Sequence, residues 1–177
     1  MRPEQEEAFA EFVATRGAGL RRVALAVTGD WHRADDLVQD VLVKLYLAWP
    51  LRDARAGDVW LRTTLVRAWI DETRRPWRRH ERTTDAVPDA VVARPDGDGD
   101  PAGVLAVLRL LPPRQRACLV LRFLEDWSVE QTAQALRCST GTVKSQTSRA
   151  LDTVRALPPV VLDQLGSAAH DADRSTR

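Results

Sequence analysis

Cysteine and histidine are scarce in this chain of 177 residues, which contains 2 Cys and 3 His. A disulfide framework is therefore not expected, nor is a metal site built from clustered Cys and His ligands. No apolar run approaches the roughly 18 residues that a membrane span needs. The acidic N-terminal stretch MRPEQEEAFAEF does not fit a signal peptide. We therefore expect a cytoplasmic protein with no membrane contact, no cofactor and no metal.

A large excess of charge of either sign is also missing, because 26 Lys+Arg face 25 Asp+Glu and the net charge is +1. The balance conceals an uneven distribution. Residues 58–82 carry 7 basic and 4 acidic groups, residues 101–157 carry 8 and 4, and residues 83–100 carry 1 and 5. Two basic blocks of net charge +3 and +4 thus flank a spacer of −4, a pattern that allows local nucleic-acid binding without an overall basic protein.

Alternation with a period of two is absent, so no strand is predicted and the fold class is all-α, with two small helical domains. Residues 83–100, rich in Pro, Gly and Asp, predict a flexible linker between a domain at 1–82 and a domain at 101–157, which a tail at 158–177 follows. Apolar periodicity and cap residues predict helices over about 31–49, 58–75, 114–124, 128–137 and 140–155. The segment LRDARAGDV, residues 51–59, is predicted to be a loop.

The strongest motif is WSVEQTAQALRCSTGTVKSQTSRALDTVR, residues 127–155. Two short helices joined by a tight turn, with the small Ala133 at their crossing and Val143 packing back on the first helix, describe a helix-turn-helix. The second helix would present short polar groups and cations to a major groove and its phosphates. The alternative is an ordinary helical hairpin with a solvated basic face. The predicted contacts are Thr140, Thr142, Lys144, Ser145 and Arg149.

A second segment, VWLRTTLVRAWIDETRRPWRRHER, residues 59–82, interleaves arginine with tryptophan. Guanidinium groups bind phosphates and exposed indoles stack on unpaired bases, so this composition suits single-stranded or distorted DNA. The spacing of Trp60 and Trp69 favours core positions, whereas Trp77 is expected to be exposed. Cys118 is predicted to lie in a core, and Cys138 to be a small packing residue in the turn.

A third segment, HRADDLVQDVLVKLY, residues 32–46, places acidic and polar side chains opposite an apolar stripe. Taken alone, that pattern is most often a solvated helix face. Asp36 and Asp40 at i, i+4 could in principle hold a metal, but no further ligand accompanies them. A metal-dependent nuclease is therefore a remote alternative.

These three segments, in this order, resemble the extracytoplasmic-function (ECF) sigma factors of bacterial RNA polymerase. DDLVQDVLVKLYLAW resembles the helix that binds the β′ coiled coil of the polymerase, and WLRTTLVRAWIDETRR resembles the segment that captures the −10 element. LPPRQRACLVLRFLEDWSVEQTAQALRCSTGTVKSQTSRAL resembles the domain that reads the −35 element and docks on the β flap. Within it, the run CSTGTVKSQTSRAL is similar in sequence to the SigE-like actinobacterial subgroup.

The resemblance implies a promoter-specificity subunit that catalyses no reaction, with core RNA polymerase and promoter DNA as partners and an anti-sigma factor as a further candidate. It implies polymerase contact by four residues, Asp35, Asp36, Gln39 and Asp40. It implies −10 contact by Arg62, Arg67, Arg74, Arg75, Trp77 and Arg78, and −35 contact by the five residues of the last helix.

Two positions depart from the family pattern. Arg67 stands where many members have asparagine, and Arg137 stands where glycine is usual before the turn. The acidic linker could mimic RNA in a basic channel of the polymerase, or it could be a solvated tether. The rival function is a helix-turn-helix regulator that binds duplex DNA without polymerase.

Overall fold

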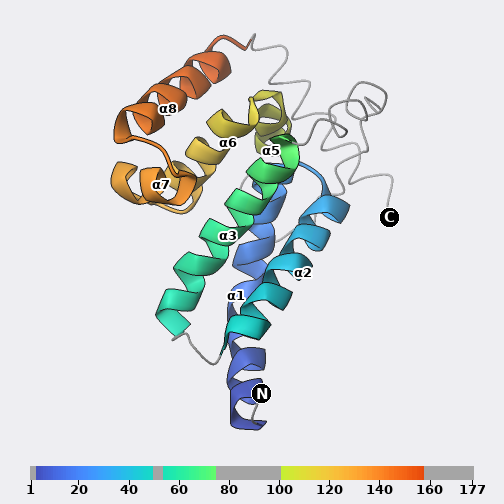
Figure 1. Ribbon diagram of the computed structural model, residues 1–177. Helices are drawn as coiled ribbons and strands as arrows, with labels where there is room; N and C mark the ends of the chain where they lie inside the picture. Colours follow the sequence, from blue (N-terminus) through green and yellow to red (C-terminus); the bar gives the residue numbers. More distant parts are fainter. Residues whose placement is uncertain (1–2, 50–53, 75–100, 158–177) are drawn as a thin grey trace, which may run out of the picture.

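The computed structural model describes residues 3–49, 54–74 and 101–157, and every regular element in these ranges is a helix (Figure 1). The all-α fold class is thus confirmed. The elements are α1 (Pro3–Thr28), α2 (Trp31–Ala48), α3 (Ala54–Arg74), α5 (Pro101–Leu110), α6 (Pro113–Leu119), the π-helical turn η2 (Val120–Leu124), α7 (Val129–Leu136) and α8 (Thr140–Arg155). The predicted linker at 83–100 and tail at 158–177 lie outside the described residues.

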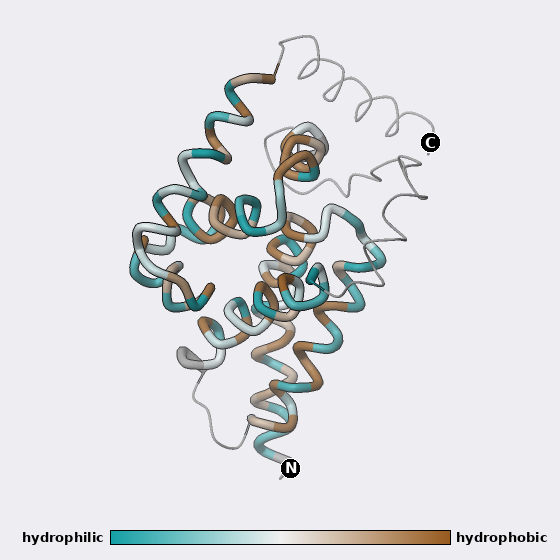
Figure 2. Tube along the Cα trace, turned by 45° about the horizontal axis from the view of Figure 1, so that its top comes forward, coloured by the Kyte–Doolittle hydropathy of each residue, from teal (hydrophilic) through white to brown (hydrophobic). Residues whose placement is uncertain are grey.

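Helices α1, α2 and α3 form a bundle around large buried side chains. In Figure 2 hydrophilic and hydrophobic residues alternate along the helices, as amphipathic helices require. Two neighbouring residues form the junction between α1 and α2. Gly29 adopts a φ of +74°, and the carboxylate of Asp30 caps α2 by accepting a hydrogen bond of 2.7 Å from the amide of Arg33. The predicted cap is thereby confirmed. Side chains at the centre of the bundle include Leu20, Val23, Val41, Leu45, Leu61, Leu65 and Trp69.

Helix α3 begins four residues before the predicted start at Asp58, so the predicted loop at 51–59 is wrong from residue 54 onward. Ala54, Arg55 and Ala56 have good helix propensity. Gly57 then brings the helix backbone close to α1, because a Cβ atom at this position would lie 3.4 Å from the Phe12 ring. Packing against Phe12 therefore favours continuing the helix through the glycine.

The helix predicted over 114–124 is also interrupted. Its α-helical part ends at Leu119, and Val120–Leu124 form a π-helical turn in which the amide of Glu125 donates to the carbonyl of Val120 at 3.1 Å. Such turns re-aim the residues that follow them. The change in winding ends at Glu125, whose side chain contacts α3, as described below.

The C-terminal helices have small cores of their own. Cys118 of α6, Ala133 of α7 and Val143 of α8 form one cluster, with Cys138 packed against it. The predicted core position of Cys118 and the predicted contacts of Ala133 and Val143 are confirmed. A second cluster joins α6 and α8 through Leu119 and Ala150.

The two halves pack against each other, with α1 and α3 on one side and α5, α6, η2 and α7 on the other (Figure 1). Trp69 of α3 is fully buried, and Trp60 is half-buried against the same core, so Trp60 is less enclosed than predicted. Side chains from the C-terminal half extend this core without a break: Leu105, Ala117, Val120, Leu121 and Ala135. The described helices therefore form a single packed body.

Candidate nucleic-acid interface

The helix-turn-helix is built from local hydrogen bonds that its sequence dictates. Ser128 caps α7 by accepting from the amide of Gln131 at 3.1 Å, and the Gln131 side chain accepts from the amide of Ser128 at 2.7 Å. Arg137 then adopts the left-handed conformation, with φ 51° and ψ 52°, and Ser139 caps α8 through the amide of Thr142 at 3.1 Å. The turn thus reaches left-handed geometry at a residue other than glycine.

Helix α8 has one buried face and one face open to solvent. Val143 and Ala150 are fully buried, whereas Thr140, Lys144, Ser145 and Arg149 are exposed. Thr142 is half-buried, and its hydroxyl lies 2.9 Å from that of Ser139. All five residues predicted on this helix therefore lie in its N-terminal two-thirds. The amino end of a helix favours phosphate, so this arrangement suits entry into a DNA groove.

The arginines predicted on α3 lie in two different environments. Arg74 is exposed beside Asp71, at 3.9 Å, whereas Arg62 and Arg67 contact the C-terminal half of the chain. Arg75, Trp77 and Arg78 lie outside the described residues. Half of the predicted −10 set can thus be placed, and two of those three arginines point into an interface.

Arg62 lies in a nearly enclosed charge cluster. Its guanidinium pairs with Asp58 one helical turn earlier and with Glu125, whose side chain is only 6% exposed. Burial lowers the pKa of Arg62, but the charge of Glu125 and the contacts with Asp58 outweigh that effect, so its pKa is raised. Arg62 therefore stays charged in this position.

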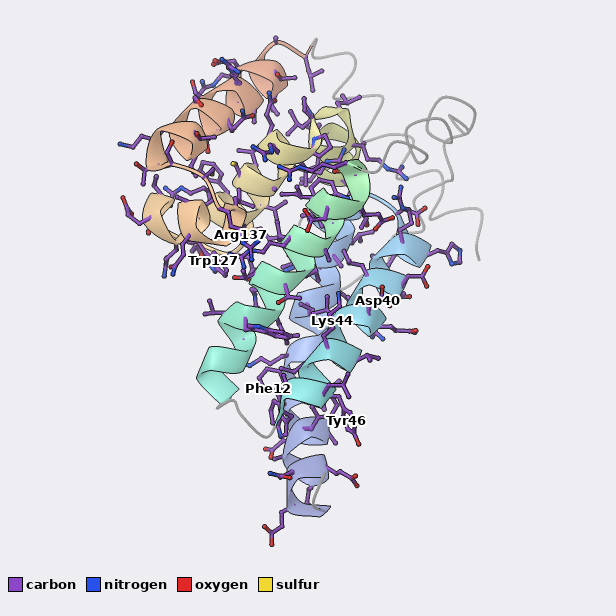
Figure 3. All side chains as sticks on the ribbon, viewed as in Figure 1. Phe12, Asp40, Lys44, Tyr46, Trp127 and Arg137 are labelled. Carbon is purple, nitrogen blue, oxygen red and sulfur yellow. The ribbon has the colours of Figure 1, made fainter. Side chains whose placement is uncertain are left out.

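Arg67 makes two hydrogen bonds to the end of α7. Its Nε donates to the carbonyl of Ala135 at 2.6 Å, and its Nη2 donates to the carbonyl of Gln134 at 2.9 Å. Burial and the positive charge of Arg137 lower the pKa of Arg67. Figure 3 shows Arg137 beside α3. The two positions that depart from the family pattern therefore lie close together in space.

Helix α2 presents an exposed face with both carboxylate and apolar groups. Asp35, Asp36, Gln39 and Asp40 are all exposed, and Asp35 pairs with Arg21 of α1 at 3.2 Å. Figure 3 shows Asp40, Lys44 and Tyr46 along this helix. The sequence prediction missed the apolar part of the face, where Val43 is 60% and Leu47 76% exposed. The spacing 36, 40, 43, 47 could have revealed it, since these positions follow one face of a helix.

No helix among the described residues is long and apolar enough to cross a membrane. Groups of three or more His, Cys, Asp or Glu side chains that could hold a metal ion are likewise missing from those residues.

Comparison with known families assigns the two halves separately. Residues 12–79 match the family described as Sigma-70 region 2, and residues 103–154 match Sigma-70, region 4. Region 2 spans the bundle of α1 to α3, and region 4 contains the helix-turn-helix. Both segments singled out for nucleic-acid binding lie within a matched region, apart from residues 80–82 and 155.

Curated relatives match nearly the whole chain. The RNA polymerase sigma-E factor of Streptomyces avermitilis is 39% identical over 153 residues, which cover 83% of each chain. The protein of the same name from Streptomyces coelicolor is 36% identical and covers 83% of this chain and 84% of its own.

Solved structures share the fold. The sigma factor RpoE of Bartonella quintana, in complex with the anti-sigma factor NepR, superposes with a TM-score of 0.67 at 24% identity and covers 84% of this chain and 95% of its own. CnrH, in complex with the cytosolic domain of CnrY, superposes with a TM-score of 0.59. The curated relatives and the two matched regions show that the chain belongs to the ECF family of RNA polymerase sigma factors, which direct transcription initiation and are not enzymes.

Proposed function

We propose that this sigma factor reads promoters through three surfaces: α8 in the major groove of the −35 element, the arginine-rich end of α3 on the −10 strand, and the exposed face of α2 on core polymerase. The observation that carries the proposal is the division of α8 into a buried face, at Val143 and Ala150, and an exposed polar face. Such a helix can enter a groove without disturbing the packing beneath it.

On the −35 side, the exposed cations of α8 have distinct roles. Lys144 lies in the second turn, where recognition helices reach base edges and phosphates, and the exposed Arg149 farther along is assigned to phosphate. The Ser145 hydroxyl donates to the carbonyl of Thr142 at 3.0 Å, so its remaining capacity is as an acceptor. The short Ser145 side chain can thus contact only groups close to the helix, whereas the longer Lys144 and Arg149 side chains reach farther from it.

On the −10 side, Arg62, Arg67 and Arg74 belong to α3, and Arg75, Trp77 and Arg78 follow it in the sequence. Guanidinium groups would bind the phosphates of the melted strand, and the indole would stack on an unpaired base, at about 1–3 kcal/mol for a stack. Arg67 in place of asparagine changes the chemistry available to a captured base from an amide to a cation. We therefore expect base preference at the −10 element to differ from that of members with asparagine.

For core polymerase we propose the face of α2 that contains Asp35, Asp36, Gln39 and Asp40. Exposed apolar groups grouped with carboxylates are typical of protein contact surfaces rather than of plain solvated helices. Val43 and Leu47 add such apolar area at the same face. The β′ coiled coil is the proposed partner here, and the β flap is the proposed partner of the C-terminal domain.

The remaining partners follow from the same assignment. We propose that the chain acts in the cytoplasm, where core polymerase is found, and that an anti-sigma factor is a candidate regulator. For the domains, we propose region boundaries at 1–82 and 101–157, joined by the acidic segment 83–100 and followed by the tail 158–177.

Reconstituted transcription tests the proposed function. Purified chain is added to core polymerase with a pool of genomic fragments, and the 5′ ends of the transcripts are mapped. We expect ends that share one upstream motif and that disappear when the chain is omitted. Tight binding to duplex fragments without core polymerase, combined with no new transcripts, would instead identify a polymerase-independent regulator.

A further inference from the structure

An ion pair connects the first turn of α2 to the last turn of α3. The Nη2 atom of Arg33 donates a hydrogen bond to the Oε1 atom of Glu72 at 3.0 Å, across 39 positions of sequence. Figure 1 shows the start of α2 and the end of α3 at the same end of the three-helix bundle. Both partners lie within the half of the chain that matches Sigma-70 region 2.

The side chains of this pair are more enclosed than those of an ordinary surface ion pair. Arg33 is 34% and Glu72 27% exposed, whereas Arg21 and Asp35, which pair across α1 and α2, are 57% and 53% exposed. Fully exposed pairs contribute little, because water and salt screen the charges and two long side chains must be ordered. Partial burial reduces that screening, so the pair between Arg33 and Glu72 is the better suited to fix one helix against another.

The start of α2 gives Arg33 a well-anchored backbone. Its amide donates to the carboxylate of Asp30 at 2.7 Å, which is the cap of the helix. The next residue, Ala34, is fully buried in the core of the bundle. The guanidinium therefore extends from a position that a cap and core packing both fix.

The last turn of α3 has less support from the core. Ile70 is the last buried residue of this helix. Beyond it, Glu72 and Thr73 are half-buried, and Asp71 and Arg74 are exposed. Helix ends open easily where apolar packing stops, since their last carbonyls have no partner within the helix. The ion pair thus attaches the weakly packed end of α3 to the anchored start of α2.

Neither charge suits the helix end on which it lies. The amino end of a helix carries the positive end of the helix dipole, and the carboxyl end carries the negative end. Arg33 places a cation in the first turn of α2, and Glu72 places an anion in the last turn of α3. The stability of the separate helices therefore does not account for this pair. Its contribution is the contact between the two helices.

We propose that Arg33 and Glu72 are positioning residues for the −10 strand: their ion pair fixes the direction of the last turn of α3 and thereby places Arg74, and the proposed −10 residues that follow it in the sequence, against the DNA. Both residues act through α3, and neither is assigned a contact with DNA. This inference rests on the −10 role proposed for the end of α3. It adds Arg33, which lies outside the segment that interleaves arginine with tryptophan.

The test measures how fast the chain, assembled with core polymerase, opens a promoter that the mapped transcripts identify and that contains 2-aminopurine in its −10 element. Glu72→Gln removes the carboxylate and keeps the size of the side chain. The ion pair is lost, but so is a charge that opposes the helix dipole, so the midpoint of thermal unfolding should change little. Strand opening should be about three- to tenfold slower than with the parent. Glu7→Gln, at an exposed carboxylate of α1, is the matched control and should open the promoter at the parental rate.

Exchange of the two charges tests whether the residues act as a pair. Arg33→Glu combined with Glu72→Arg restores an ion pair and places each charge at the helix end that favours it, so both helices should be retained. We expect each single substitution to slow opening and the double substitution to recover about half of the parental rate or more, as a double-mutant cycle requires of coupled residues. Affinity for core polymerase is measured in parallel, so that poor assembly is not counted as slow opening.

Strand opening by Glu72→Gln at the parental rate would overturn the proposal. Faster opening would also overturn it, because Glu72 would then act as a carboxylate that repels phosphate and not as a positioning residue. A double substitution that opens no faster than the slower single one would show that the two residues do not act as a pair. Failure of the proposed function would be seen separately, as an absence of promoter-specific transcripts from the parent itself.

Discussion

The guanidinium of Arg67 on α3 donates to the main-chain carbonyl of Ala135 on α7 at 2.6 Å, across 68 positions of sequence. The contact joins a residue predicted to hold the −10 strand to the helix that supports the −35 reader. The hydrogen bond therefore links α3 to the end of α7. Together with the ion pair between Arg62 and Glu125, it holds the two halves of the described chain against each other.

Lys144→Ala is expected to weaken promoter binding more than folding. Lys144 is exposed near the start of α8, so its truncation should disturb the core little. Loss of one phosphate contact should weaken binding to all sequences similarly and reduce the slope of log affinity against log salt by about 1. The measurement is a salt titration of promoter binding by the chain assembled with core polymerase.

Arg16→Ala is the control for this substitution, because it removes an exposed cation from α1, away from the proposed polymerase and DNA surfaces. It should leave the salt slope for promoter DNA unchanged. Equal promoter affinity for Lys144→Ala and the parent would contradict the assignment of α8 as the reader.

Charge reversal at Asp36 and Asp40, to lysine at both positions, is expected to lower the affinity for core polymerase at least about tenfold. Both side chains are exposed, so the bundle should keep its helicity and its midpoint of thermal unfolding should shift little. Co-purification with core polymerase and a direct affinity measurement test this. The control reverses Glu6 and Glu7, two exposed carboxylates of α1. Unchanged co-purification would count against the α2 face.

The apolar part of the α2 face should matter as much as its charge. Leu47→Ser removes a side chain that is 76% exposed in the free chain, so the free energy of unfolding should change by less than about 0.5 kcal/mol. If Leu47 is buried on the polymerase, its loss should cost roughly 1–2 kcal/mol of binding, or about 5- to 30-fold in affinity. Val104→Ser, at another exposed apolar position, is the control. Equal losses for both variants would show that the effect is not specific to α2.

Arg137→Gly is expected to stabilise the helix-turn-helix. Arg137 has a φ of 51°, a conformation that costs a residue with a side chain roughly 1–2 kcal/mol and costs glycine little. The substitution also removes the positive charge that lowers the pKa of Arg67. Arg137→Ala separates the two causes, since it removes the charge and keeps the backbone cost. We expect chemical denaturation to show a gain of about 1 kcal/mol for glycine and less for alanine. A larger gain for alanine would assign the cost to charge instead.

Features governed by neighbours in the sequence could be predicted, and those governed by distant packing could not. The caps at Asp30, Ser128 and Ser139 depend on residues three positions away, and the structure has them where the sequence placed them. The acceptors of Arg67 are main-chain carbonyls, which every residue possesses, so the sequence holds no sign of that contact. The early start of α3 likewise depends on the place of Gly57 beside Phe12, a contact between two helices.

The arginine-rich segment likewise depends on distant packing. Composition indicates that its cations can bind phosphate, but composition does not show which of them another part of the chain occupies. Arg62 and Arg67 meet Glu125 and the end of α7, whereas Arg74 remains exposed. Residue type alone therefore does not show which of these arginines is exposed.

Thiol chemistry provides a test of the C-terminal core. Burial raises the pKa of Cys118 to about 12, with a smaller contribution from Cys138, and burial also raises the pKa of Cys138. Relative to a thiol of pKa 9, a thiol of pKa 12 has about a thousandfold less thiolate at pH 8. Alkylation by iodoacetamide at pH 8, followed by mass spectrometry, should therefore modify Cys138 well before Cys118 in the folded chain and both at similar rates in denaturant.

The raised pKa of Cys118 also predicts how stability depends on pH. The folded state holds the thiol proton to higher pH than the unfolded state does, so the contribution is complete below the unfolded pKa near 9 and is lost as pH rises toward 12. Cys118→Ala removes this titration, and Cys138→Ala is the matched control. Urea unfolding between pH 8 and 11 should show a steeper loss of stability for the parent and for Cys138→Ala than for Cys118→Ala. Parallel pH profiles for all three proteins would show that Cys118 is not held protonated in the core.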